Sequence, residues 1–209
     1  MNRSALSSGD SVFYSAFHME SVILASASPQ RKALLEGLGL PFTVAVSTVD
    51  EDGHPERSPR DRALVLAQMK AQEVAAKHPG AFVIGCDTLV VTADGDLHEK
   101  PANADEARRM IGKQSGRACV VHSGLCVIGP SGAYSDVSSS TVHFTELSSE
   151  QIDWWISTNL WQGRSGAFQI DGPGQLMIEK LEGDWTSVVG LPVFLLGRLL
   201  EQAGYPLCK

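Results

Sequence analysis

The stretch VILASASPQR, residues 22–31, runs from four apolar residues directly into a serine, a proline and a basic side chain. The apolar part predicts a short buried strand over residues 22–25, and the rest predicts a helix over residues 29–38. Ser28 is a favourable N-cap and Pro29 a favourable first helical residue. Free backbone N–H groups at such a helix start can bind an anion. The alternative is a capped helix whose basic residues face solvent.

Strands and helices alternate over the first part of the chain, and hairpins dominate the rest. Working outward from the first strand, further strands are expected at residues 42–46 and 81–85, with a long helix at residues 60–77 between them. This order predicts an α/β fold in which helices flank a mixed, twisted central sheet. The remaining predictions are a hairpin over residues 89–98, a helix over 105–113, two antiparallel runs over 117–128 and 133–145, a helix over 149–158, a strand over 175–181 and a helix over 192–203.

The composition is that of an ordinary globular chain of 209 residues with a formal net charge of -7. An acidic balance argues against a non-specific nucleic-acid binder, and no apolar run approaches the ~18 residues of a membrane span. The four cysteines form no CxxC pair, so reduced thiols and a cytoplasmic location are expected. We predict a single domain over residues 21–209, preceded by a loosely ordered leader over residues 1–20 that lacks a signal-peptide core.

Two charged residues occur where the pattern calls for burial. Lys70 falls on the apolar stripe of the predicted helix, so it either reaches the surface or points at an anion in a cleft. Asp87 follows the buried strand at residues 81–85, at the edge where open α/β sheets bind ligands. Its carboxylate could hold Mg²⁺ or activate a water, or it could simply cap the next turn.

Three loops carry further polar groups. Lys100 could reach the same cleft and bind phosphate as a point charge. The acidic residues 50–52 could ligate a metal or form a solvated turn. The glycine-rich segment 163–172 contains Arg164 and Phe168, and it could close on a flat base or be an ordinary surface loop.

Several common motifs are missing from the chain. There is no GxGxxG fingerprint, Walker A motif or GxSxG nucleophile elbow, and no two histidines have the HxxxH spacing of a helical zinc site. These absences argue against three common enzyme classes.

Taken together and in chain order, the motifs resemble the Maf family of nucleotide pyrophosphatases over residues 22–205. Each motif is weak alone, and the ordered set is specific. The resemblance implies an elongated, two-lobed Maf/inosine-triphosphatase-like fold with a central cleft, a possible homodimer, and release of pyrophosphate from nucleoside triphosphates with Mg²⁺ or Mn²⁺. The matching segments are SASPQR (26–31), DE (50–51), KA (70–71), GCDT (85–88), KPA (100–102), SGR (115–117), GAF (166–168) and VGLP (189–192).

The resemblance also implies residue roles. Asp87, Lys70 and Lys100 are expected to be catalytic, and Glu51 and Asp87 are expected to hold the metal. We expect the triphosphate to spread its charge over the loop at residues 26–31 and the lysines, while Asp87 orients or deprotonates the attacking water. Substrate binding is assigned to Ser26, Ser28, Gln30, Arg31, Thr88, Arg164, Phe168 and Asp171.

The sequence departs from the family pattern at positions that bear on the base. Gln30 replaces an arginine, and Arg164 and Phe168 replace a lysine and a tyrosine. Asp171 replaces a glutamine of the dTTP/UTP branch, as in the branch that acts on 7-methyl-GTP, whereas Thr88 matches the dTTP/UTP branch. A carboxylate can accept from the N1–H and N2–H₂ of guanine, so Asp171 slightly favours a guanine-type base.

Two other classes of protein remain as alternatives. A nucleotide-binding regulator of cell division or growth would need no catalysis, and the presence of Asp87, Lys70 and Lys100 argues against it. A nucleic-acid-binding protein is disfavoured by the acidic balance.

Overall fold

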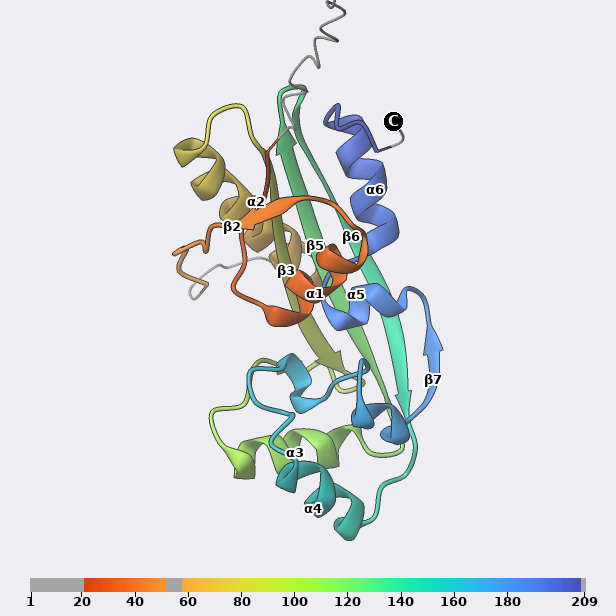
Figure 1. Ribbon diagram of the computed structural model, residues 1–209. Coiled ribbons are helices and arrows are strands. Elements are labelled where there is room, and N and C mark those ends of the chain that lie inside the picture. Colours follow the sequence, from red (N-terminus) through yellow and green to blue (C-terminus); the bar gives the residue numbers. More distant parts are fainter. Residues whose placement is uncertain (1–20, 52–57, 208–209) are drawn as a thin grey trace, which may run out of the picture.

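The computed structural model describes residues 21–51 and 58–207 (Figure 1). The predicted leader over residues 1–20 and the acidic Asp52 lie outside the described residues. The strands are β1 (Val22–Leu24), β2 (Phe42–Val44), β3 (Phe82–Thr92), β4 (Leu97–His98), β5 (Ala118–Gly129), β6 (Gly132–Phe144) and β7 (Ile178–Glu182). The helices are α1 (Pro29–Gly37), α2 (Pro59–Lys77), α3 (Ala104–Gln114), α4 (Ser149–Ser157), α5 (Trp185–Val189) and α6 (Val193–Gln202), with 3-10 turns η1 (Ser165–Ala167) and η2 (Pro173–Met177).

One sheet organises the molecule, with the strand order β2-β1-β3-β5-β6-β7 and β4 paired to β3. β1 runs parallel to β2 and β3, and the other pairings are antiparallel. Figure 1 shows an elongated molecule in which the long strands β3, β5 and β6 connect α2 and α6 at one end to α3 and α4 at the other. The predicted mixed α/β sheet flanked by helices is confirmed. No helix in the described ranges is long and apolar enough to cross a membrane.

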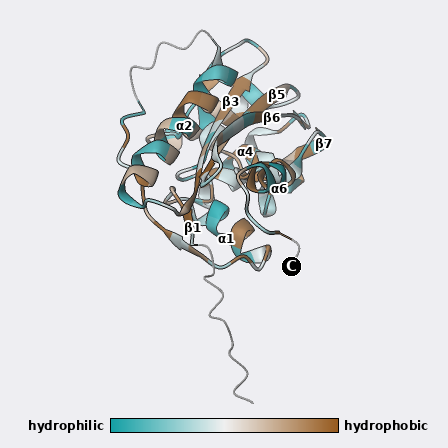
Figure 2. Cartoon of the chain, turned by 90° about the horizontal axis from the view of Figure 1, so that it is seen from above, coloured by the Kyte–Doolittle hydropathy of each residue, from teal (hydrophilic) through white to brown (hydrophobic). Residues whose placement is uncertain are grey.

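Alternation along β3 sends successive side chains to opposite faces of the sheet. Phe82, Ile84 and Cys86 belong to the hydrophobic cluster that α6 covers. Val83 belongs to the cluster that α2 covers on the other face. Seen from above, α2 carries both hydrophilic and hydrophobic colours, as expected of a helix with one face on the sheet (Figure 2). Asp87 is four residues beyond Val83 and therefore shares its face of the sheet, so the Asp87 side chain points towards α2.

The predicted break in β3 is wrong. A strand over residues 81–85 and a separate hairpin over 89–98 were expected, but β3 continues to Thr92 because β5 pairs with it from Val83 onwards. Asp87 therefore lies within a strand instead of following one. β1 pairs with β3 only as far as Ile84, so the edge of β3 is open beside Asp87. This open edge lies beyond the carboxyl end of the parallel strand β1, and α/β sheets commonly bind ligands beyond the carboxyl ends of their parallel strands.

Two other sequence predictions also need correction. The strand expected at residues 175–181 begins only at Ile178, because η2 occupies residues 173–177. The short helix α5 was not predicted at all. Asp184 caps α5 through a 2.8 Å bond from the Thr186 N–H to its carboxylate.

Two glycines bring the backbone of α2 directly onto the sheet. A Cβ atom built at Gly85 would lie 2.2 Å from the carbonyl oxygen of Ala67, and one at Gly124 would lie 2.1 Å from that of Ala63. Real Cβ atoms do not approach backbone so closely, so a side chain at either position would push the helix away.

We predict that Gly124→Ala lowers the free energy of unfolding by about 3 kcal/mol, because the backbone of α2 has to move. Gly112→Ala is the matched control, since nothing lies within 4 Å of a Cβ there and alanine favours a helix by about 0.5–1 kcal/mol. Urea denaturation measures both. Equal stability of the two variants would contradict the close contact at Gly124.

Candidate active site

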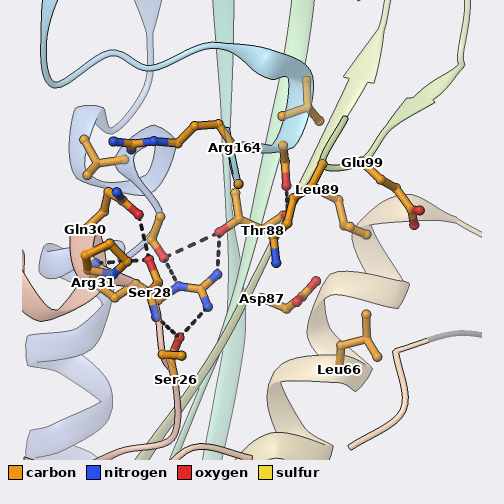
Figure 3. Close-up of a pocket in the computed structure, with 18 of the residues that line it drawn as sticks. Ser26, Ser28, Gln30, Arg31, Leu66, Asp87, Thr88, Leu89, Glu99 and Arg164 are labelled. Atoms are coloured by element: carbon orange, nitrogen blue, oxygen red, sulfur yellow. Dashed lines mark hydrogen bonds between the residues drawn. The ribbon is translucent and has the colours of Figure 1, made fainter. Parts of the chain in front are cut away.

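A cleft of about 520 Å³ opens at the exposed edge of β3. This volume is within the usual range of small-molecule sites. Its walls come from the β1–α1 loop, α2, β3, the loop at residues 99–100, the segment 163–171 and the end of α5 (Figure 3). The cleft brings together all the site residues predicted from the sequence, namely Ser26, Ser28, Gln30, Arg31, Glu51, Lys70, Asp87, Thr88, Lys100, Arg164, Phe168 and Asp171.

The β1–α1 loop forms one wall. Ser28 caps α1, with its Oγ accepting from the Arg31 N–H at 3.4 Å, and Pro29 is the first helical residue. The Ser28 N–H in turn donates to the Ser26 Oγ at 3.2 Å. The predicted cap is confirmed, and the helix start faces the cleft as an anion site requires.

Arg31 is held by acceptors from three parts of the chain. Its Nε donates to the Gly190 carbonyl at 2.9 Å, its Nη1 to the Ser26 Oγ at 3.0 Å, and its Nη2 to the Thr88 Oγ1 at 3.2 Å (Figure 3). A cation in the first turn opposes the helix dipole. These acceptors offset part of that conflict within the protein, and a bound anion would offset more.

On the opposite wall, Lys70 reaches into the cleft and not to the surface. Its Nζ lies 2.6 Å from the Asp87 Oδ1 and 2.8 Å from the Glu51 Oε1. Lys70 is 7% exposed and Asp87 5% exposed. Buried charges persist when they are paired, so the lysine on the apolar stripe is explained by two carboxylates. The Asp87 Oδ2 is buried and accepts no hydrogen bond from the described residues.

The pKa of Glu51 reflects the same cluster. Partial burial by itself would raise the pKa, but the hydrogen bond from Lys70 and the charges of Lys70, Lys100 and Arg31 outweigh it. The net pKa is therefore lowered, and the carboxylate stays ionised at neutral pH. Lys100 lines the cleft close enough to contribute to this field.

Arg62 is a cleft residue that the sequence analysis missed. Its Nη2 donates to the Glu51 carbonyl at 3.1 Å and lies 3.1 Å from the Glu99 Oε1. It thereby ties the loop before α2 to the loop that carries Lys100. The sequence pattern could have indicated this position. Spacing of four residues places Arg62 on the same face of α2 as Leu66 and Lys70.

Arg164 and Asp171 face each other at the other rim of the cleft. The Arg164 Nη1 lies 3.4 Å from the Asp171 Oδ1, and its Nη2 donates to the Gln169 Oε1 at 3.1 Å. In the orientation of the Gln30 amide that satisfies both of its ends, the amide nitrogen donates to the Ser28 Oγ at 3.0 Å. The amide oxygen then accepts from the Arg164 Nη2 at 2.9 Å. Glutamine at position 30 can accept from Arg164, which an arginine there could not do.

Phe168 forms part of the cleft wall but is only 5% exposed. Its ring packs edge-on against Phe144, with centroids 5.1 Å apart. This packing identifies Phe168 as a core residue that shapes the cleft, with little free face for stacking on a base.

The donor set for a metal is small. No group of three or more His, Cys, Asp or Glu side chains arranged to hold a metal ion is found in residues 21–51 and 58–207. Two carboxylates, Glu51 and Asp87, do converge on the cleft, and the Asp87 Oδ2 still has acceptor capacity. Carboxylate oxygens and waters suit Mg²⁺, which commonly uses one or two protein carboxylates together with substrate phosphates. The donors therefore fit a metal that arrives with the substrate.

The fold and the cleft define a class of α/β protein that binds a phosphate-bearing small molecule beside a buried carboxylate–lysine pair. Within that class, the family model for Maf-like proteins matches residues 21–203, and the chain belongs to this family. A dTTP/UTP pyrophosphatase from Deinococcus radiodurans is 43% identical over 183 residues, which cover 88% of this chain and 93% of the relative. Another from Symbiobacterium thermophilum is 40% identical over 189 residues, or 90% of this chain and 97% of the relative.

A solved structure of a HAM1 protein from Coxiella burnetii aligns with a TM-score of 0.41 and 14% identity. The alignment covers 60% of this chain and 73% of that chain. A likeness of this size supports no further conclusion.

We predict that Lys70→Met lowers the free energy of unfolding by about 3 kcal/mol, because it leaves the buried Asp87 carboxylate without its cation. Lys77→Met on the same helix is the control, since Lys77 makes an exposed ion pair with Glu73 and should change stability little. Thermal or urea unfolding distinguishes the two. Similar small losses in both would show that the Lys70 pair contributes little to folding.

Proposed function

We propose that the protein hydrolyses nucleoside triphosphates, with dTTP and UTP preferred, to the monophosphate and pyrophosphate. The observation that carries this proposal is the single cleft in which Asp87, paired to Lys70, faces the β1–α1 loop and Arg31. The relatives from Deinococcus radiodurans and Symbiobacterium thermophilum, which are named dTTP/UTP pyrophosphatases, support the same reaction.

The triphosphate is bound by the cations that surround the cleft. The N–H groups at the start of α1 and the remaining donors of Arg31 face one side, and Lys100 faces the other. Arg31 is preorganised by the contacts described above, so it costs little reorganisation when the triphosphate binds. Lys100 is assigned to stabilise the charge that develops on the departing pyrophosphate, and Arg31 to hold the triphosphate.

Asp87 is assigned to orient the water that attacks the α-phosphorus and to accept its proton. Lys70 holds the Oδ1, which leaves the Oδ2 as the acceptor for the water. The 2.6 Å contact with the Lys70 Nζ fixes the orientation of the carboxylate, which a general base must hold towards its water. Lys70 is therefore assigned to keep Asp87 correctly oriented.

Glu51 and Asp87 are the residues that would hold a divalent metal, Mg²⁺ or Mn²⁺. When bound, the metal supplies charge neutralisation on the phosphate oxygens. Glu51 is held in place from two sides, because Lys70 contacts its carboxylate and Arg62 binds its backbone carbonyl.

The deciding experiment measures pyrophosphate release from dTTP, UTP, GTP and 7-methyl-GTP with Mg²⁺ and then Mn²⁺. We expect dTTP and UTP to be the best substrates and a chelator to stop the reaction. Asp87→Asn should lose at least about 10³-fold in kcat while keeping a cooperative unfolding transition.

Asp94→Asn is the matched control for this experiment, because Asp94 makes an exposed ion pair with Arg117 outside the cleft. It should retain wild-type turnover. A folded protein that releases no pyrophosphate from any triphosphate would indicate the nucleotide-binding regulator instead. An active Asp87→Asn variant would remove Asp87 from the mechanism.

Our preference for a pyrimidine base departs from the guanine preference that Asp171 suggested in the sequence. The Asp171 carboxylate is engaged by Arg164, so it is not free to accept both N–H groups of guanine. Arg164, with Gln169 beside it, offers donors that match the carbonyl groups of thymine and uracil.

We predict that Asp171→Gln raises the ratio of dTTP to GTP turnover by about fivefold, because the uncharged amide releases Arg164, whose donors match the carbonyl groups of thymine and uracil, a gain of about one hydrogen bond. The ratio of kcat/KM values for the two substrates is the measurement. Glu179→Gln, on β7 away from the cleft lining, should leave the ratio unchanged. An unchanged ratio in Asp171→Gln would place Asp171 away from the base.

We also propose a cytoplasmic location and a homodimer, both of which the resemblance and the composition favour. The single domain over residues 21–209 and the lack of nucleic-acid affinity stay predictions of the same kind. The formal net charge of -7 supports the latter.

A further inference from the structure

We propose that Ser123 is a positioning residue that orients Arg31 through Thr88. The inference rests on the proposed function, because it concerns how the cleft holds its phosphate-binding cation. Ser123 lies on β5 directly opposite Thr88 on β3, and it is fully buried. The two hydroxyl oxygens are 2.9 Å apart. Ser123 does not line the cleft itself, so it acts only through its neighbour.

The direction of the hydrogen bonds follows from counting donors. The Ser123 hydroxyl has one hydrogen, and the Ser187 carbonyl, which can only accept, lies 2.7 Å from its oxygen. The Ser123 hydrogen therefore goes to Ser187. The Thr88 hydroxyl must then donate to Ser123, which leaves lone pairs of the Thr88 oxygen for the Arg31 Nη2 at 3.2 Å (Figure 3). The resulting chain runs from Arg31 to Thr88 to Ser123 to the Ser187 carbonyl.

Such a chain polarises each member in one direction, and each hydroxyl becomes a better acceptor because it also donates. Among the described residues, the other acceptor near the Thr88 hydroxyl is the Gly190 carbonyl at 3.4 Å, a distance that makes a weak bond. The Gly190 carbonyl already accepts from the Arg31 Nε and from the Cys86 thiol. Without Ser123, the Thr88 hydroxyl would therefore have no good acceptor and no fixed orientation.

The consequence for Arg31 is geometric. A guanidinium is planar and has five N–H groups, and three of them are fixed by Gly190, Ser26 and Thr88. Three fixed acceptors define the plane of the group, so its remaining donors are aimed at a bound phosphate without further loss of entropy. Loosening the Thr88 contact frees one end of the guanidinium and weakens anion binding.

The two carbonyl groups that accept from Ser123 and from the Arg31 Nε lie in the same segment of the chain. The Ser187 carbonyl belongs to α5, and the Gly190 carbonyl follows its last turn. α5 is itself fixed to β6, because the Asp184 N–H donates to the Ser140 Oγ at 2.9 Å. Thr92 on β3 is also buried, does not line the cleft and bonds to the Asp96 backbone, so it offers a control for a merely structural role.

The test measures the Kd of inorganic pyrophosphate by titration calorimetry and the KM and kcat for dTTP, each with Mg²⁺. Ser123→Ala should weaken pyrophosphate binding and raise KM by about fivefold, with kcat changed less than about twofold. Thr92→Val should leave Kd and KM unchanged, even if it lowers the unfolding temperature. A merely structural loss at position 123 would reduce the folded fraction and kcat but not move KM.

A double-mutant cycle isolates the proposed chain. Thr88→Val removes the middle hydroxyl while keeping the shape of the side chain, so adding Ser123→Ala to it should weaken pyrophosphate binding no further. Additive losses, or an unchanged Kd in Ser123→Ala, would overturn the proposal. If Ser123→Ala fails to fold, Ser123→Cys replaces it. A thiol forms a weaker hydrogen bond, so the expected loss of pyrophosphate affinity is smaller, about twofold. An unchanged Kd would again overturn the proposal.

The readouts also separate this inference from the proposed function. Tight pyrophosphate binding by the wild-type protein without release of pyrophosphate from any nucleoside triphosphate would refute the hydrolysis. The effect of Ser123→Ala on the Kd of pyrophosphate would still decide the role of Ser123.

Discussion

The direct contact between the backbone of α2 and the sheet is the constraint on which the cleft depends. Gly85 and Gly124 lie beneath the helix at the turns that carry Ala67 and Ala63, and neither has room for a Cβ atom. Lys70 lies one helical turn beyond Ala67 and therefore reaches the Asp87 Oδ1 at 2.6 Å. Lifting the helix by even the size of a methyl group would break a contact of this length. Two residues without side chains thus determine the position of the most buried charges in the molecule.

The open edge of β3 explains why neighbouring residues of one strand can share a single cleft. β1 ends opposite Ile84 and β4 joins β3 only at Val90, so no strand of residues 21–51 and 58–207 covers that edge of β3 between them. Alternation turns Asp87 towards α2 and Thr88 towards Arg31 and α5, and the open edge lets both side chains border the same space. A longer β1 would fill the cleft with a strand. The shortness of β1 is therefore as important to the site as any charged residue.

The sequence predicts those parts of the site that depend on local patterns. The cap at Ser28 follows from the residue type, and the place of Lys70 on the buried face of α2 follows from helical spacing, although the spacing left open whether its end reaches the surface. The continuation of β3 through Asp87 could not be predicted, because it depends on pairing with β5 more than thirty residues later. Likewise, α5 is a single short turn with weak periodicity, although it supplies the carbonyl groups of Ser187 and Gly190. Contacts between distant segments decide such features, and local propensity does not record them.

The charges of the cleft are balanced before any ligand binds. Its lining contains five cationic side chains and four anionic ones, although the chain as a whole carries a formal net charge of -7. Three of the five cations are already paired, Lys70 with Asp87 and Glu51, Arg164 with Asp171, and Arg62 with Glu99. A triphosphate brings several negative charges into this nearly neutral space, more than the unpaired donors of Arg31 and Lys100 can offset. A divalent cation carried in with the triphosphate would supply the missing charge, so the electrostatic balance supports the proposed metal independently of the positions of its ligands.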